Sequence, residues 1–225
     1  MDDQGGVEEL ASGSDESRMA ELYPAEVEQE CELRDGTRIL LRPLKPTDGE
    51  ALELFFSALD DRSLFNRFFA PRVLLTPEQM APIKDLDYDR HFAVGGFVDG
   101  PDREGLIGVA NWVRDSTACM AHIAFIVRDD WQQRGLGTLL ARVLSEAALA
   151  RGLHGFKADV LKNNRPVLRI LEASGYTVRS RLDDDAYRVV VHLDGGRGAE
   201  GKEDADGRLG FGETDCVGKR VRRRR

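Results

Sequence analysis

The stretch that decides the fold of this 225-residue chain reads Gln132-Gln133-Arg134-Gly135-Leu136-Gly137-Thr138. An apolar segment ending at Ile126-Val127 precedes it, and apolar residues at helical spacing follow it as far as Arg151. The two glycines allow a tight turn and a close approach of the backbone to a ligand. N–H groups at the start of the helix would point outward, and the helix dipole adds positive potential there. A strand, a glycine turn and a helix in this order predict a cradle for a pyrophosphate.

Two common glycine loops do not fit these residues. A Walker A loop ends in Gly-Lys-Ser/Thr, whereas Gly137 is followed directly by Thr138. The dinucleotide fingerprint places a third glycine where Leu140 stands. A plain strand–helix turn would not require Gln132 three residues before Gly135. The pyrophosphate is therefore expected to belong to another class of ligand.

The rest of the periodicity predicts strands and helices on either side of this stretch. A hairpin turning at Asp35-Gly36 is expected over residues 33–42, and further strands over 91–98, 106–113, 119–127, 156–161 and 187–193. Helices are expected over residues 47–59 (opened by a Thr47/Glu50 capping box), 62–69, from Thr76, 136–151 and 165–174. Strands first, then strands alternating with helices, imply a mixed α/β sheet with helices on both faces.

Composition divides the chain into a domain and two tails. Residues 1–30 hold ten acidic residues against one arginine, and residues 194–225 contain eight glycines and a basic end at 219–225. Both tails are predicted to be disordered, and residues 31–193 to form one domain of nearly neutral charge. The basic end could dock on nucleic acid or on an acidic partner. A solvated tail is favoured because nothing aromatic accompanies the arginines.

The sequence also indicates a compartment. No apolar run approaches the roughly 18 residues of a membrane span, and the acidic N-terminus is unlike a signal peptide. The three cysteines, Cys31, Cys119 and Cys216, are scattered and odd in number, which predicts neither a disulfide framework nor a zinc site. We therefore expect a cytoplasmic protein without a membrane partner.

Residues 132–137 match the Q/R-x-x-G-x-G/A motif, and in this they resemble the GNAT acetyltransferase superfamily. The resemblance implies a mixed, mostly antiparallel sheet of about six to seven strands, and acetyl-CoA as co-substrate. It implies that the backbone of Ile126 and Val127 bonds the pantetheine arm. Asn164-Arg165-Pro166, ahead of Gly175-Tyr176, resembles a second segment whose Asn contacts that arm. The resemblance assigns the pyrophosphate to Gln132, Gln133, Arg134, Gly135, Leu136, Gly137 and Thr138.

Three further stretches are similar to one branch of that superfamily, the bacterial protein lysine acetyltransferases that modify AMP-forming acyl-CoA synthetases. They are residues 33–43, Arg67-Phe68-Phe69 and Asp87-Tyr88-Asp89-Arg90. The likeness covers about residues 31–180. It implies an N-acetyltransferase whose acceptor amine belongs to a protein lysine, with an acyl-CoA synthetase as a partner.

That branch typically carries a glutamate base on the strand before the loop, and His122 stands at this position. Histidine suits proton abstraction near neutral pH, since its unperturbed pKa is about 6.5. The alternatives are a satisfied core histidine, a changed acceptor or a lost base. Asp159 is the reserve base. Leu171 stands where many family members have a tyrosine acid, which that position therefore does not supply.

The remaining candidates have weaker signals. Cys119, beside Ala118 and Met120, is expected to be a buried structural thiol, so we expect direct transfer in a ternary complex, with the N–H groups of residues 123–127 binding the oxyanion. Arg67, Asp87 and Asp89 either bind the acceptor or form surface salt bridges. A cluster predicted to lie in the core contains Leu64, Phe65, Phe68 and Phe69.

Two other functions remain open at this stage. A small-molecule amine acetyltransferase would share the fold and the loop. A non-catalytic acyl-CoA-binding module would follow if His122 marks a lost base. The nearly neutral charge of the predicted domain argues against binding of nucleic acid.

Overall fold

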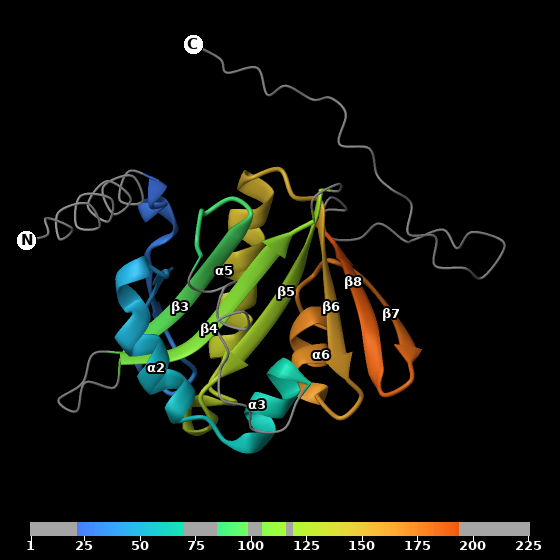
Figure 1. The fold of residues 1–225 in the computed structure, drawn as a ribbon, viewed down its shortest axis with the longest axis horizontal. Helices are drawn as coiled ribbons and strands as arrows, with labels where there is room; N and C mark the ends of the chain where they lie inside the picture. The colour runs from blue at the N-terminus through green and yellow to red at the C-terminus, as the bar shows by residue number, and fades with distance from the viewer. Residues whose placement is uncertain (1–21, 70–84, 99–104, 116–118, 194–225) are drawn as a thin grey trace, which may run out of the picture.

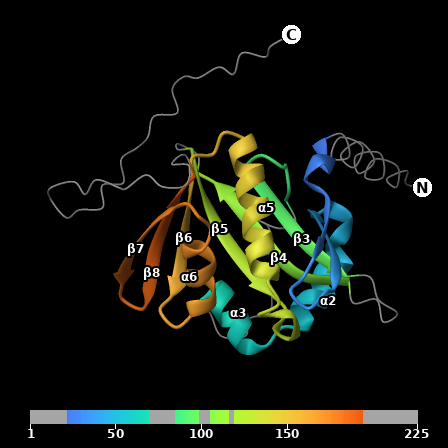
Figure 2. The same ribbon diagram turned by 180° about the vertical axis from the view of Figure 1, so that it is seen from behind.

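The computed structural model describes residues 22–69, 85–98, 105–115 and 119–193, which form one sheet with helices on both faces (Figures 1 and 2). The predicted helix from Thr76, the basic end and most of both tails lie outside these residues.

The strand order is β1-β2-β3-β4-β5-β6-β8-β7. Neighbouring strands are antiparallel except for the parallel pair β5 and β6. The predicted mixed α/β sheet is confirmed. Its strands are β1 (Gln29–Glu32), β2 (Arg38–Pro43), β3 (His91–Val98), β4 (Gly105–Arg114), β5 (Met120–Val127), β6 (Gly155–Leu161), β7 (Thr177–Asp183) and β8 (Ala186–His192).

Helices α2 (Gly49–Ser57) and α3 (Asp61–Phe68) cover one face of the sheet, and α5 (Leu136–Ala150) and α6 (Arg165–Glu172) cover the other (Figures 1 and 2). Short 3-10 turns lie at Ala25–Val27, Pro46–Asp48 and Asp129–Trp131. The predicted capping box at Thr47 is wrong. Asp48 takes that role instead, because its carboxylate accepts the Lys45 backbone N–H at 2.8 Å and pairs with Arg42 at 2.7 Å.

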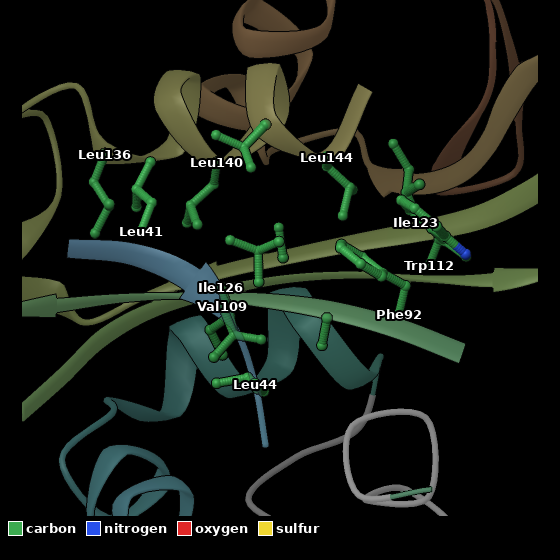
Figure 3. Close-up of a cluster of buried hydrophobic side chains, with 14 of the residues drawn as sticks. Leu41, Leu44, Phe92, Val109, Trp112, Ile123, Ile126, Leu136, Leu140 and Leu144 are labelled. Carbon is green, nitrogen blue, oxygen red and sulfur yellow. The ribbon is translucent and has the colours of Figure 1, made fainter. Parts of the chain in front are cut away.

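The core lies on both sides of the central strands. On the α5 side, Leu136, Leu140 and Leu144 lie in a row over the sheet, with Leu144 at the end where Phe92 stacks on Trp112 with ring centroids 4.3 Å apart (Figure 3). On the α2 side, Leu44, Val109 and Ile126 are buried (Figure 3). Burial of each such side chain contributes about 1.5–3 kcal/mol, so these contacts fix α5 firmly on the sheet.

Glycines in the sheet set how close α5 comes to it. A Cβ on Gly96 or on Gly108 would lie 2.9 Å from a methyl carbon of Leu136. Larger residues at these two positions would therefore push the first turn of α5 outward. The sheet thus fixes the place of the glycine turn that precedes this helix.

The sheet opens between β5 and β6. These strands pair only at Met120↔Gly155, Ala121↔Phe156 and His122↔Lys157. Beyond His122 they diverge toward the end of the sheet where α3 and α6 lie (Figure 1). The β6-facing edge of the rest of β5 is therefore left without a partner strand within the described sheet.

Both edges of the sheet differ from the expectation of six to seven strands. β7 was not predicted, and β1 begins at Gln29, inside the segment assigned to the acidic tail. Both are edge strands rich in exposed polar residues, and neither has the apolar alternation that marks a buried strand. The hairpin turn at Asp35-Gly36 is confirmed, since Gly36 donates its N–H to Leu33 O at 3.0 Å.

Candidate active site

The glycine turn has the backbone that a cradle for an anion needs. Gly135 is the N-cap of α5 and has a φ of 98°, and Gln133 also has a positive φ of 64°. A φ of this sign favours glycine at position 135. The first N–H groups of an α-helix have no acceptor four residues earlier within the helix, so those of Leu136 and Gly137 suit a bound phosphate, whereas the Thr138 N–H donates to Gly135 O at 3.1 Å.

Gln132 holds the turn in place through its side chain. Its Nε2 donates to Val127 O at 3.1 Å, to Asp129 Oδ1 at 3.0 Å and to Ser63 Oγ at 3.1 Å. Ser63 Oγ in turn donates to Asp129 Oδ1 at 2.6 Å. The residue predicted to bind the cofactor thus joins the end of β5 to α3, and its amide is committed to these contacts.

Arg134 is similarly engaged. Its Nη1 pairs with Asp35 Oδ2 at 3.0 Å, its Nη2 donates to Asp130 O at 2.9 Å, and its guanidinium lies 4.5 Å from the Trp131 ring centroid. The side chain therefore ties the cradle to the β1–β2 turn. Its charge still adds positive potential beside the start of α5.

Gly137, predicted to allow a close approach of the backbone to a ligand, also serves helix packing. A Cβ at this position would lie 2.7 Å from Ile170 Cδ1 of α6. The glycine allows α5 and α6 to approach each other. It thereby sets the position of Asn164, the N-cap residue of α6.

A narrow cavity of about 40 Å³, termed here the slot, lies where β5 and β6 diverge. Its lining comes from residues 123–125 of β5 and 158–160 of β6, Asn66 and Arg67 of α3, and Asn164 and Val167 of α6. Asn164 makes no helix-capping hydrogen bond in the described structure, so its amide is available to a ligand there. Because helices from both faces contribute, the slot runs from one side of the sheet to the other.

Ile126 and Val127, expected to bind the pantetheine arm, lie on β5 just beyond the slot. Ile126 is buried at 5% exposure, and the Val127 carbonyl already accepts from Gln132 at 3.1 Å. Residues 123–125 of the same strand line the slot. The fit to an extended pantetheine arm therefore rests on this part of the open edge.

His122 is the last β5 residue paired with β6, and it is not a core histidine. Its side chain is 56% exposed, and its Nε2 lies 3.3 Å from Asp115 Oδ1. The other oxygen of the same carboxylate pairs with Lys157 Nζ at 2.8 Å. Sequence reasoning missed Asp115 and Lys157, because strand pairing alone brings residues 115, 122 and 157 together.

A second, wide cavity of about 560 Å³ lies beside His122. It adjoins the slot, because Ala158 and Asp159 line both. Asp159, the reserve base, thus lies at the junction. The other lining side chains that carry charge are Lys157, Asp183, Asp184 and Arg188. Arg188 pairs with Asp183 at 2.7 Å, which leaves the lining rich in carboxylates.

Arg67 is the one member of its predicted trio that reaches the slot. Its Nη2 donates to Asn111 Oδ1 at 3.2 Å. Its Nε is buried and without a hydrogen-bond partner. Burial lowers the pKa of Arg67 to about 10. A surface salt bridge does not explain this side chain.

Asp87 and Asp89 have structural roles. Asp87 Oδ1 accepts the backbone N–H groups of Asp89, Arg90 and His91 at 2.7–3.0 Å. Asp89 pairs with Arg114 at 2.8 Å, as the salt-bridge interpretation predicted. Neither residue lines the slot or the wide cavity.

The predicted aromatic cluster divides between core and cavity. Leu64 is buried, and Phe68 packs against the core. Phe65 and Phe69 are 40% and 43% exposed, and Phe69 lines the wide cavity. Phe69 is the C-cap residue of α3 and has a φ of 55°, so it no longer follows the helical spacing that predicted it to lie in the core.

Two residues are unsuited to chemistry at the site. Cys119 is buried, as predicted, but it is disulfide-bonded instead of being the thiol that we expected. Leu171, at the position of the family's tyrosine acid, is 3% exposed and packs in the core. Neither position offers a nucleophile or a proton donor.

Two further features of the described residues bear on the class of protein. None of their helices combines the length and the apolar character needed to cross a membrane. No group of three or more His, Cys, Asp or Glu side chains among them is arranged to hold a metal ion.

Comparison with known proteins now adds to this geometry. Residues 38–177 match a family model described as an acetyltransferase (GNAT) domain. An acetyltransferase of Pseudomonas aeruginosa is 28% identical over 163 residues, which are 72% of this chain and 86% of that protein. Acetyltransferase Pat of Mycolicibacterium smegmatis is 32% identical over 145 residues, or 64% of this chain and only 43% of that longer protein.

Solved structures give the same result. The GNAT domain of S. lividans PAT superposes with a TM-score of 0.68 at 27% identity, over 76% of this chain and 99% of that domain. A cAMP-binding acyltransferase from Mycobacterium smegmatis gives a TM-score of 0.55 at 25% identity, over 84% of this chain and 53% of that chain. These similarities to Pat and PAT support the resemblance to the branch that the sequence suggested.

Proposed function

Because the chain belongs to the GNAT acetyltransferase family, we propose that it transfers the acetyl group of acetyl-CoA directly to a lysine side chain of a protein. The observation that carries the proposal is the junction of the slot with the wide cavity at Asp159, beside His122. One opening suits the acyl arm, and the other suits an amine arriving from the opposite side. Acetyl-CoA supplies an activated acyl group as a thioester.

The residues around the slot suit this co-substrate. The start of α5 after Gly135 would hold the pyrophosphate, and the unpaired edge of β5 and the Asn164 amide would hold the pantetheine arm. Backbone N–H groups of residues 123–125 would stabilise the tetrahedral oxyanion.

His122 would accept the proton of the attacking amine. A lysine amine is about 99.9% protonated at pH 7, since its unperturbed pKa is near 10.4, and only its neutral form attacks. A histidine that donates Nε2–H to Asp115 keeps a lone pair on Nδ1 for this proton. The Asp115 carboxylate then stabilises the imidazolium that forms.

The charge of the wide cavity supports a cationic acceptor. Asp159 and Asp184 are carboxylates of its lining for which no ion pair with an arginine is found among the described residues. They would attract a lysine ammonium. Because the chain resembles Pat, we propose that the protein carrying this lysine is an AMP-forming acyl-CoA synthetase. We propose that the reaction takes place in the cytoplasm.

The same cavity favours a second candidate, a small-molecule amine. About 560 Å³ with a carboxylate-rich lining is large enough to hold a small polyamine entirely. The fold and the slot would be unchanged, so only the acceptor distinguishes the two functions.

Thiol release from acetyl-CoA tests these functions with a purified acyl-CoA synthetase or a polyamine as acceptor. We expect release that depends on the synthetase, with the acetyl group found on a lysine by peptide mass spectrometry. His122→Ala should abolish it, whereas the control His192→Ala, an exposed histidine at the end of β8, should not. Release with the polyamine alone would favour the second candidate. Binding of acetyl-CoA without transfer to any amine would indicate a non-catalytic module.

A further inference from the structure

Arg67 is a cation inside the slot with a neutral partner only. Its Nη2 contacts the Asn111 amide oxygen at 3.2 Å, and Asn111 is itself 3% exposed. The guanidinium also lies 4.7 Å from the centroid of the neighbouring Phe68 ring. Neither contact supplies a negative charge.

The Nε–H of Arg67 has no acceptor. This atom is buried and has no hydrogen-bond partner, and among the described residues Arg67 forms no ion pair. A buried charge without a counter-charge is costly, and proteins rarely keep one without a use for it. Burial also lowers the pKa of this side chain, to about 10, and no nearby carboxylate opposes that shift.

The position of Arg67 limits what the missing anion can be. Arg67 lies on α3, and residues 123–125 of β5 line the same slot. If the proposed function holds, the acyl end of the co-substrate lies here, and the pyrophosphate lies at the start of α5. The anion that reaches Arg67 must then be part of the acyl group.

We propose that the slot selects an acyl group that ends in a carboxylate, the CoA thioester of a short dicarboxylic acid, and that Arg67 binds this carboxylate. The transfer itself is unchanged: the amine nitrogen forms a bond to the thioester carbon, the C–S bond breaks, the amine proton passes to His122, and CoA leaves as the thiolate. The product is an amide that carries a free carboxylate. This inference rests on the proposed use of the slot for the acyl arm.

Asp159 does not neutralise Arg67. Its carboxylate lines the same slot, but it is on β6 at an exposed position and forms no ion pair with the guanidinium. A carboxylate of the ligand would therefore pair with the guanidinium and not with Asp159. The slot therefore has a cationic side at α3 and an anionic side at β6.

Isothermal calorimetry of the full chain with succinyl-CoA and with butyryl-CoA tests the proposal. These ligands have acyl chains of the same length and differ in the terminal carboxylate. We expect the wild type to prefer succinyl-CoA by about 10- to 100-fold in Kd, the range of a charge-assisted hydrogen bond. Arg67→Gln should reduce this preference to about one, and Arg67→Lys should retain part of it.

Arg62→Gln is the matched control, because Arg62 is an exposed arginine on the same helix, and it should leave the preference unchanged. Equal affinity of the wild type for both ligands would overturn the proposal, even if Arg67→Gln fails to fold. Equal weakening of both ligands by Arg67→Gln would also overturn it. Binding and transfer of acetyl-CoA without selection would leave the proposed function intact, whereas failure to bind any acyl-CoA would reject both.

Discussion

His122 and Lys157 share one carboxylate, that of Asp115, at the last paired position of β5 and β6. A histidine in this arrangement has one nitrogen directed to a fixed anion and the other left for substrate. In the proposed function, His122 takes the role of a glutamate base at the same position, and the negative charge lies on Asp115 beside it. At this scale the site is defined by three side chains from different strands or strand ends.

Asp115→Asn should lower kcat for acetyl transfer by about 10- to 100-fold, because an amide cannot stabilise the imidazolium as a carboxylate does. The KM for acetyl-CoA should stay within about twofold, since Asp115 lines neither cavity. Steady-state kinetics measure both constants. Asp89→Asn is the control, because it removes a carboxylate paired with Arg114 that also lines neither cavity. Equal loss in both variants would argue against a role for Asp115.

Arg67→Met should stabilise the unliganded protein. Burial lowers the pKa of Arg67 to about 10, so the folded state holds this proton less tightly than the unfolded chain does. The charge therefore lowers the free energy of unfolding at every pH below that value, including neutral pH. We expect a gain of about 1–3 kcal/mol at pH 7, read from the urea midpoint. A loss of stability would mean that Arg67 holds the fold together.

The ionisation of Asp87 makes the free energy of unfolding depend on pH in the acidic range. Burial by itself would raise its pKa, but the backbone N–H groups of His91, Asp89 and Arg90 outweigh it and lower the pKa. A lowered pKa adds stability that is present above the unfolded value near 3.9 and is lost as pH falls through the folded value.

Asp87→Asn should therefore cost about 1 kcal/mol at pH 7, and the difference from wild type should shrink toward pH 3. Urea unfolding at the two pH values measures it. A difference that is constant with pH would show that the charge of Asp87 does not matter.

At the scale of elements, the site depends on how α5 and α6 are placed. Leu136 packs against glycines of the sheet, and Gly137 lets α6 approach α5. These contacts set the position of α6, whose N-cap residue Asn164 lines the slot. β5 contributes an open edge, because beyond His122 it has no partner strand on its β6 side within the described sheet.

Gly135→Ala tests the cradle, with Gly152→Ala as its control at the other end of the same helix. Both glycines have positive φ, 98° and 72°, so alanine is strained at either one and should cost about 1 kcal/mol of stability. Only Gly135→Ala should weaken acetyl-CoA binding, by about tenfold, because it distorts the backbone that would face the pyrophosphate. Calorimetry gives the Kd. Equal acetyl-CoA affinity in both variants would contradict the proposal that this turn binds the pyrophosphate.

At the scale of the whole molecule, the proposed function places the two substrates in two adjoining cavities. Residues of α3 and α6, which lie on opposite faces of the sheet, line the slot, and the wide cavity lies beside Phe69 at the end of α3. The two cavities meet at Ala158 and Asp159. This arrangement suits direct transfer, because donor and acceptor can be bound together without a covalent intermediate.

The parts of this fold that are local in sequence were predictable, and the parts made by pairing were not. Residues 132–138 lie next to one another, so the cradle and the family could be inferred from them directly. Asp115 and Lys157 meet His122 only through strand register, which no spacing along the chain reveals. β1 and β7 were missed or misplaced because edge strands need no apolar alternation. The commitment of the Gln132 side chain to Ser63 and Asp129 also depends on tertiary contact.

The central claim is that His122 accepts the amine proton where β5 and β6 part. The single-turnover rate of acetyl transfer from bound acetyl-CoA to a saturating acceptor, in the wild type and in His122→Ala, tests it most directly. We predict a rate at least about 100-fold lower in the variant, with the Kd for acetyl-CoA within about twofold of wild type. An unchanged rate in a variant that binds acetyl-CoA normally would contradict the account.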